Sequence, residues 1–224
     1  MRLKLNKILQ DSVGEIDKIR NNVLRASIKE IHNSLSIREE NSRLISFSYV
    51  WLSGVLESFF KNTNKEIFNY INSLSLPHES ISENLLIACL GDELSSMQDT
   101  RGMKKWISKI VLFSKINSKE ITVFLDESYI PYDKKTIRSE HIKLMWEFYG
   151  FSGNSLPNPR YHLVLEDLAN GRNDVAHGEI DPLSFGRSKR IGQVLRIIND
   201  VEEIILHINI FSEEYLVCKK FIRN

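Results

Sequence analysis

The stretch GRNDVAHG at residues 171–178 places an arginine, an amide and a histidine within less than two turns of a predicted helix. A helical wheel over residues 165–177 gives two stripes. The first contains Leu165, Leu168, Arg172 and Val175, and the second contains Glu166, Asn170, Asn173 and His177. We expect the first stripe to face a core, with the Arg172 guanidinium reaching the polar side, and the second to form a polar surface. Gly178 is placed to end the helix.

These residue types suit a reaction at a phosphodiester. Histidine transfers protons near neutral pH, and arginine offers a fork of donors to the charge that builds on a phosphorane. Asn173 and His177 are four residues apart, so they share one surface and can orient each other. Cleavage of RNA by its own 2′-hydroxyl needs these parts and no metal. One copy supplies one histidine and one arginine, and a two-fold dimer supplies a separate acid and base.

The stretch resembles the Arg-x4-6-His motif of HEPN-superfamily ribonucleases in its common form RN-D-x-AHG. Residues 52–61, LSGVLESFFK, are similar to the alLEsfxK helix of the HEPN branches that end in RNxxAHG, such as RiboL-PSP-HEPN and related stand-alone domains. The order of predicted elements also agrees with these branches. The resemblance implies an all-α, HEPN-like helical bundle in which Arg172 and His177 are the catalytic pair and Asn173 tunes the site.

From this resemblance we expect a metal-independent endoribonuclease that leaves a 2′,3′-cyclic phosphate and a 5′-hydroxyl. We expect RNA as substrate, a homodimer through the motif face, and a toxin or anti-phage defence effector with an antitoxin or defence-system partner. No cofactor is expected, and the spacing around His177 matches no common zinc pattern. The alternative is a non-catalytic HEPN-like module that binds RNA or protein. A toxin paired with a nucleotidyltransferase is disfavoured, because Glu179 stands where such families often carry tyrosine.

Plainer interpretations of the motif stay open. Arg172 can neutralise a buried carboxylate, and Glu57, which interrupts an apolar helix, is the obvious one. Glu57 can instead pair with Lys61 one turn on, or hold Arg172 in a catalytic pose. His177 is also a residue type that the helix dipole favours at a C-terminus. We assign supporting polar roles to Glu57, to Asn173 and to Asp174, the last as a solvated or capping carboxylate.

Basic residues after the motif are candidates for RNA binding. Arg187, Lys189 and Arg190 begin the predicted helix that follows the motif, so we expect them near it. Their contribution to RNA affinity would depend on salt. Lys134, Lys135 and Arg138 form a weaker candidate set, and the other histidines, His141 among them, are expected at the surface or half-buried.

We predict one HEPN-like domain over residues 1–224. Its expected parts are N-terminal helices in 1–76, an inserted middle section in 78–158, and the motif and final helices in 160–224. Predicted helices cover 2–33, 41–61 with a continuation to 74, 81–96, 101–114, 136–149, 160–177 and a last segment from about 184. At most a short β element is expected, at 121–125. The aromatic run around Trp51 is expected to be core and not a base-stacking surface.

The amino-acid composition narrows the class of protein further. The 224 residues are 42% apolar and 26% charged, which suits a globular domain with a sizeable core. A net charge of +1 requires any RNA contact to come from a local patch or from paired subunits. Cys89 and Cys218 fit buried thiols of a reducing compartment. The uncharged run 44–56 is shorter than the roughly 20 residues of a membrane span, and no signal-peptide pattern is present, so we expect a cytoplasmic protein without membrane contact.

Overall fold

The computed structural model describes residues 2–29, 35–133 and 135–223. Within these ranges the chain forms α-helices and no strand, which confirms the predicted all-α class. The helices are α1 (Arg2–Lys29), α2 (Leu35–Ser73), α3 (Glu83–Cys89), α4 (Gly91–Asp99), α5 (Met103–Ile116), α6 (Ser139–Tyr149), α7 (Tyr161–Ala176), α8 (Pro182–Ser188) and α9 (Ile191–Val217), with single 3-10 turns η2 (His78–Ser80) and η3 (Glu127–Tyr129). Residues 30–33, the end of the first predicted helix, and Lys134 lie outside the described residues.

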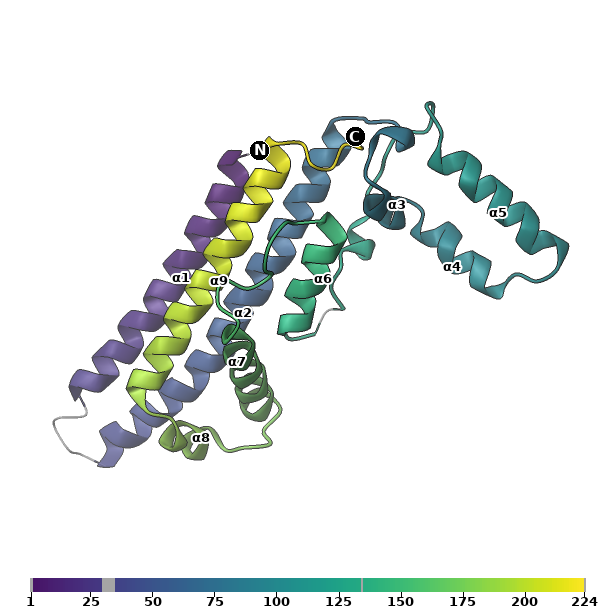
Figure 1. Ribbon diagram of the computed structural model, residues 1–224. Coiled ribbons are helices and arrows are strands. Elements are labelled where there is room, and N and C mark those ends of the chain that lie inside the picture. The colour runs from purple at the N-terminus through teal and green to yellow at the C-terminus, as the bar shows by residue number, and fades with distance from the viewer. Residues whose placement is uncertain (1, 30–34, 134, 224) are drawn as a thin grey trace.

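Three long helices, α1, α2 and α9, run side by side and form the body of the molecule (Figure 1). The predicted apolar stripe of α9 is buried throughout: Val194, Ile197, Ile198, Val201, Ile204, Ile205 and Ile208. α7 and α8 pack across α2 near one end of this body, and α6 lies against α3 and α7. Helices α3 to α5 project from the other end as an arm, defined as residues 83–116 (Figure 1). No helix in the described part of the chain is both long and apolar enough to cross a bilayer.

α2 is the central helix, because it packs on α1, α7, α8 and α9. Its core positions Leu52, Leu56 and Phe59 are each at most 2% exposed. Phe47 and Trp51 are 55% and 39% exposed, so the prediction that this whole run is core is wrong for these two residues. Trp51 lines a cavity between α1 and α2 instead of packing into the core.

The middle section departs from prediction at its first helix, and its β element is no more than the short one expected. The helix predicted over 81–96 is divided into α3 and α4, because the backbone at Leu90 leaves helical geometry (φ −115°, ψ 19°) and Gly91 then packs on the Tyr129 ring. The β-like run 121–125 makes one isolated antiparallel bridge, to the segment just before η2. A single bridge gives no ladder of backbone hydrogen bonds, so no sheet forms within the described residues.

The last predicted helix is two helices, α8 and α9. Asp181 is the N-cap of α8, because its carboxylate accepts the backbone N–H of Ser184 at 3.0 Å. Lys189 and Arg190 have extended backbones and separate α8 from α9. The predicted start near residue 184 lies two residues from the start of α8, but the single helix predicted from there is wrong because α8 ends at Ser188; the apolar periodicity of α9 is confirmed.

Two glycines let α7 and α8 come close to α2. A Cβ on Gly171 would lie 2.6 Å from Cδ1 of Tyr49 and 2.7 Å from Cζ of Phe185. A Cβ on Gly186 would lie 1.8 Å from the carbonyl oxygen of Ser42. The missing side chains thus set how deeply α7 and α8 sit on α2, and the depth of α7 fixes where its C-terminal end lies.

We predict that Gly171→Ala lowers the free energy of unfolding by about 1–3 kcal/mol, because the buried rings of Tyr49 and Phe185 must move. Gly14→Ala is the matched control. It also lies inside a helix, but nothing is within 4 Å of its Cβ, so alanine should raise the free energy of unfolding by roughly 0.5–1 kcal/mol. Urea unfolding followed by circular dichroism measures both. Equal midpoints for the two variants would contradict the close approach of α7 and α2.

Candidate functional site

The C-terminal end of α7 holds the motif at the surface of the body. The apolar residues of its first predicted stripe are buried, and Arg172 is half-buried. The helix ends at Ala176, and Gly178 turns the chain with φ +73°, as predicted for a helix stop. His177 therefore stands at the end of the helix with its side chain exposed.

Arg172 joins the polar residues of the motif by hydrogen bonds. Its Nη1 donates to Oδ1 of Asn173 at 3.1 Å and to Nε2 of His177 at 3.3 Å. Because a guanidinium can only donate, Nε2 of His177 is the acceptor and the imidazole proton lies on Nδ1. The nitrogen lone pair that can take a proton from a substrate therefore points at the guanidinium.

A polar cavity of about 450 Å³ lies beside these three residues. It is lined by residues from α2, from the loop before α6, from the start of α6 and from α7: Glu57, Asp133, Lys135, Thr136, Arg138, Glu140, His141, Arg172, Asn173 and His177. Thr136 ties the loop to the motif, because its Oγ1 donates to Oδ1 of Asn173 at 3.3 Å. The motif thus belongs to a cavity built from three separate parts of the sequence.

The two arginines of the cavity differ in their partners. Arg138 forms an ion pair with Glu166 and donates to Oδ1 of Asn170 at 2.8 Å. Glu166 and Asn170 belong to the second predicted stripe of α7, so this stripe faces the loop before α6. Within the described chain Arg172 forms no ion pair with a carboxylate, and its two partners are neutral groups. Its charge is available to an anion that enters the cavity.

Glu57 lines the cavity, but its hydrogen-bond partner is a tyrosine. Its carboxylate accepts the hydroxyl of Tyr132 at 2.6 Å. Burial, together with this hydrogen bond, raises the pKa of Tyr132 well above its usual value, so the phenol stays protonated and donates. Among the described residues no ion pair joins Glu57 to Arg172 or to Lys61. Neither of the two pairings considered from the sequence is formed.

His141 lines the cavity although the sequence analysis gave it no role in the site, as is also true of Asp133, Thr136 and Glu140. It is 6% exposed, where a surface or half-buried position was expected. Its Nδ1 accepts the backbone N–H of Arg138, and its Nε2 donates to Oδ1 of Asp133, both at 2.9 Å. Desolvation raises the pKa of Asp133, but hydrogen bonds from Lys135 and His141 outweigh it and hold that pKa below its usual value. Both ring nitrogens are engaged, so His141 holds the wall of the cavity in place.

Asp174 lies beside the cavity residues in sequence but not in the lining of the cavity. Its side chain is half-buried, and its backbone carbonyl accepts the N–H of Ile180 at 3.1 Å. This backbone contact helps to close the turn after α7. A supporting role for the Asp174 carboxylate therefore stays a prediction.

The three basic residues predicted near the motif line a different cavity. Arg187, Lys189 and Arg190 border a space of about 540 Å³ between α2 and the junction of α8 and α9. Lys189 donates to Oδ1 of Asp167 at 2.7 Å and lies 5.1 Å from the ring centroids of two buried aromatic residues. Arg187 pairs with Glu39 at 3.3 Å. The short helix α8 carries these residues to the side of α2, so closeness in sequence does not bring them to the motif.

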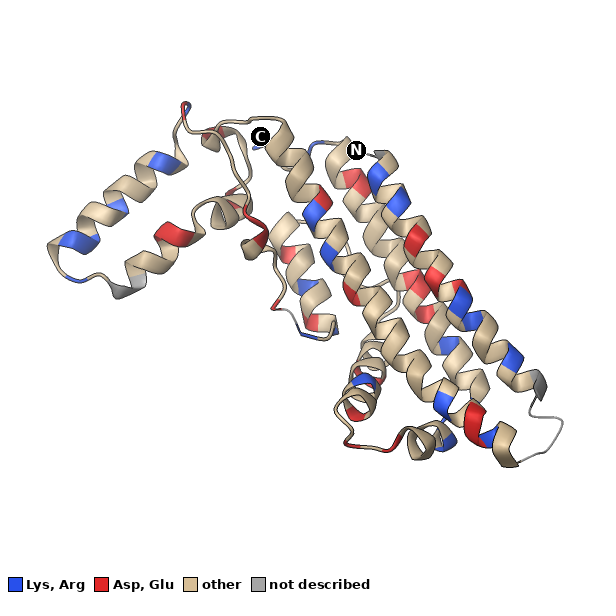
Figure 2. Ribbon diagram, turned by 180° about the vertical axis from the view of Figure 1, so that it is seen from behind, with Lys and Arg blue, Asp and Glu red and all other residues tan. Residues whose placement is uncertain are grey.

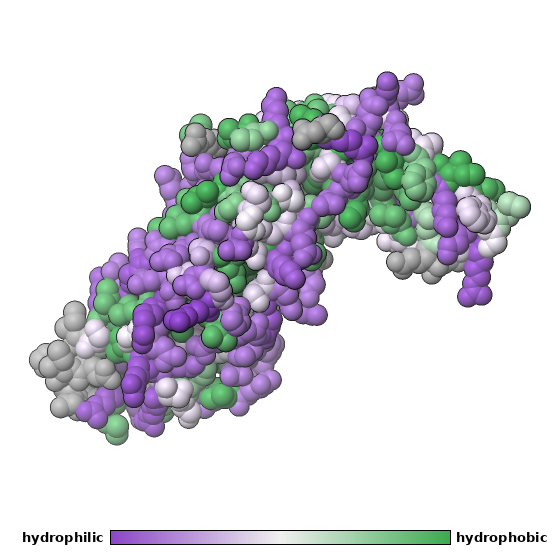
Figure 3. Space-filling model, in the orientation of Figure 1, coloured by the Kyte–Doolittle hydropathy of each residue, from purple (hydrophilic) through white to green (hydrophobic). Residues whose placement is uncertain are grey.

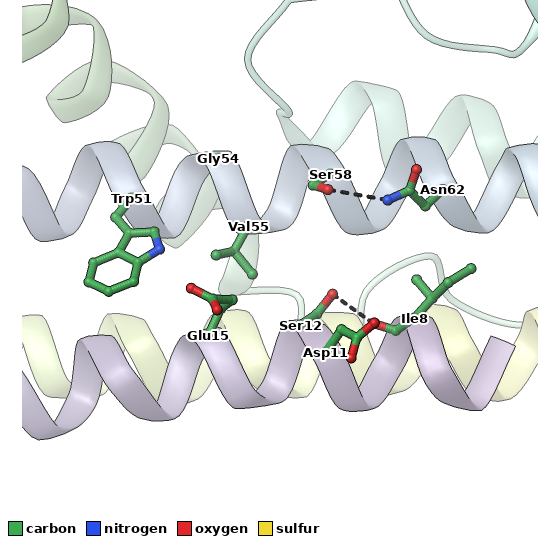
Figure 4. Close-up of a pocket in the computed structure, with 9 residues that line it drawn as sticks. All are labelled: Ile8, Asp11, Ser12, Glu15, Trp51, Gly54, Val55, Ser58 and Asn62. Atoms are coloured by element: carbon green, nitrogen blue, oxygen red, sulfur yellow. Dashed lines mark hydrogen bonds between the residues drawn. The ribbon is translucent and has the colours of Figure 1, made fainter. Parts of the chain in front are cut away.

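Another cavity, of about 380 Å³, lies between α1 and α2 and suits an anion poorly (Figure 4). Figure 4 shows its lining residues on facing turns of the two helices: Ile8, Asp11, Ser12, Glu15, Trp51, Gly54, Val55, Ser58 and Asn62. None of these lining residues is Lys, Arg or His, and the carboxylates of Asp11 and Glu15 repel a phosphate. The cavity beside the motif is therefore the better candidate for an anionic substrate.

The HEPN_MAE_28990-like HEPN family matches residues 1–221 of the chain. The chain therefore belongs to this family, and the HEPN superfamily inferred from the motif is confirmed. Membership indicates an RNA-related role. The match runs through the middle section as well as the flanking helices, and the division of the chain into three parts stays a prediction. Comparison with curated proteins and with solved structures gives no match.

We predict that Lys189→Met destabilises the fold without changing how RNA binding depends on salt. The variant keeps the hydrocarbon stem but removes the cation that pairs with Asp167, at an expected cost of about 1–2 kcal/mol. Arg190→Met is the control, because Arg190 lines the same cavity with an exposed side chain. Urea unfolding and binding of a labelled RNA at several salt concentrations check both. A shallower salt dependence in Lys189→Met would instead reveal a phosphate contact.

Proposed function

We propose that this chain is a metal-independent endoribonuclease in which Arg172 and His177 act on the scissile phosphate. One observation carries the proposal. Arg172 is half-buried, has no carboxylate partner among the described residues, and donates to the imidazole of His177 beside a polar cavity of about 450 Å³. This arrangement combines an anion-binding group with a proton acceptor, which are the two parts that 2′-hydroxyl attack requires.

The proposed reaction starts when the phosphate draws the Arg172 guanidinium away from His177. Nε2 of His177 is then free to take the proton of the 2′-hydroxyl, and O2′ attacks phosphorus. The O2′–P bond forms, the P–O5′ bond breaks, and the departing 5′-oxygen takes a proton from a second, protonated histidine. Arg172 stabilises the non-bridging oxygens of the phosphorane, and Asn173, bonded to the same guanidinium, positions it. The products are a 2′,3′-cyclic phosphate and a 5′-hydroxyl.

We propose that the second histidine is His177 of another copy, in a homodimer formed through the motif face. Two features support this arrangement. His177 is exposed at the end of α7, so a second copy can reach it. His141, the other histidine of the cavity, has both ring nitrogens engaged within the chain and is a poor proton donor for a leaving group. Glu57 faces the same cavity as Arg172 and can limit how far the guanidinium moves.

We predict that His177→Ala lowers the rate of RNA cleavage by about 10²–10⁴-fold, because the proton acceptor is lost. The assay uses total RNA and a labelled oligonucleotide in EDTA, with the product ends mapped for cyclic phosphate. His162→Ala is the matched control, because His162 is an exposed histidine on the same helix. His162→Ala should cleave at the wild-type rate.

Cleavage by His177→Ala at the wild-type rate would rule out the proposed mechanism. RNA binding without cleavage by the wild type would favour the non-catalytic binding module.

We also propose that the nuclease is a toxin or an anti-phage defence effector that an antitoxin or defence-system partner controls, on the strength of the family alone. Growth arrest on expression of the wild type but not of His177→Ala tests that role.

We predict that Arg172→Met lowers kcat by about 10²–10³-fold, and that Arg172→Lys recovers only part of the loss. Lysine restores the charge but not the fork of donors that can bind the phosphate while keeping the hydrogen bond to Asn173. Steady-state cleavage of a short RNA separates kcat from KM. Full recovery by lysine would mean that Arg172 acts as a point charge. An effect on KM alone would mean that it serves only to bind substrate.

A further inference from the structure

The apolar face of α5 is exposed to solvent. Six of its side chains are 47–76% exposed: Met103, Trp106, Ile107, Ile110, Val111 and Phe113. At 100° per residue they fall within one arc of roughly 160°, and no charged residue of α5 falls inside it. Leu112, on the opposite side of the helix, is buried at 7% exposure. We name these six residues the α5 ridge. Figure 3 shows green, apolar side chains gathered over the arm.

The α5 ridge is larger than the scattered apolar exposure of an ordinary surface. Its exposed area is on the order of 700 Å², whereas the largest apolar patch of a monomer is typically about 300–600 Å². A standard protein–protein interface buries about 800 Å² on each partner. The ridge therefore has the size of one side of an interface.

An apolar cleft lies directly beside the ridge. Its volume is about 360 Å³, and its walls come from α3, α4 and the inner side of α5, with Ile87, Leu90, Leu94 and Phe113 among the lining residues. Phe113 belongs to both the ridge and the cleft. One face of the arm thus presents a convex and a concave apolar surface next to each other.

The charges around this face also complement each other. α5 carries Lys104, Lys105, Lys109 and Lys115 and no acidic residue. α3 and α4 carry only acidic charges, among them Glu83, which pairs with Arg223 at the rim of the cleft at 3.6 Å, and Glu93, which pairs with Lys115 of α5. Figure 2 shows the blue residues on one helix of the arm and red on the other. A second arm turned by a two-fold rotation brings its basic helix to the acidic side of the first.

We propose that the arm, residues 83–116, is a self-association surface on which the α5 ridge of one copy fills the cleft of a second copy. A two-fold interface requires a surface that is complementary to itself, and a ridge beside a cleft with opposite charges meets that requirement. A bilayer fits less well, because a flat surface leaves the cleft empty. This interface is separate from the motif face and does not depend on the proposed nuclease.

The test compares Ile110→Lys with Ile210→Lys. Both isoleucines are exposed on helices, at 68% on α5 and 60% on α9, so both variants should keep the fold, which circular dichroism checks. Multi-angle light scattering on the full chain measures mass across a hundredfold range of concentration. The wild type and Ile210→Lys should associate alike. Ile110→Lys should lose one association step, with half the mass and at least tenfold weaker association.

The same mass for Ile110→Lys and the wild type would overturn the proposal, as would a wild type that is monomeric at every concentration. The wild type could instead be monomeric and float with vesicles of phosphatidylserine and phosphatidylcholine, while Ile110→Lys does not. This result would show that the ridge binds a membrane surface, and it would also overturn the proposal. RNA cleavage is measured on the same samples. Loss of association without loss of cleavage separates this interface from the motif-face dimer, and a failed nuclease assay leaves the mass measurement intact.

Discussion

The contact of α7 with α2 at Gly171 is the constraint on which the rest of the site depends. The ring of Tyr49 lies 2.6 Å from where a Cβ of residue 171 would be, so the backbone of α7 rests directly on a side chain of α2 with no room for a methyl group. The same Tyr49 donates its hydroxyl to Asp167, which pairs with Lys189 at the junction of α8 and α9. Burial raises the pKa of Tyr49, so it remains a donor. One tyrosine thus fixes both the depth of α7 and the path of the chain that follows it.

This contact leaves Arg172 little freedom in where it lies. With Gly171 against the aromatic rings, the next residue stands at the edge of the core, and its guanidinium reaches the polar side of α7. The helix then ends within two turns, and His177 is brought to the same guanidinium by the local geometry of a helix terminus. The cavity wall comes from elsewhere, from Glu57 and from the loop held by Arg138 and His141. Local structure makes the reactive group, and tertiary packing supplies its surroundings.

The sequence predicted what depends on local periodicity. The buried stripe of α9 and the stop at Gly178 follow from helix geometry, and the family match agrees with the motif. Arg172 and His177 lie on different stripes of the wheel, and the guanidinium reaches across to the imidazole as expected from its length. The sequence missed His141 because the Asp133 contact depends on how a loop folds. It placed Lys189 near the motif because it took α8 and α9 as one helix, and the extended break between them was not visible in the pattern. The sequence also could not predict that the α5 ridge is exposed, because a helical wheel shows that a face is apolar but not whether another element covers it.

In the proposed site Arg172 binds the scissile phosphate while His177 faces the adjacent 2′-hydroxyl. The most direct measurement is an NMR titration of the ¹⁵N-labelled protein with an RNA oligonucleotide whose 2′-hydroxyls are methylated, so that cleavage is blocked. We expect the Nε–H signal of Arg172 and the imidazole nitrogen signals of His177 to shift together with one Kd, while the imidazole signals of His162 stay in place. RNA binding that leaves the Arg172 and His177 signals unmoved would contradict the proposed site.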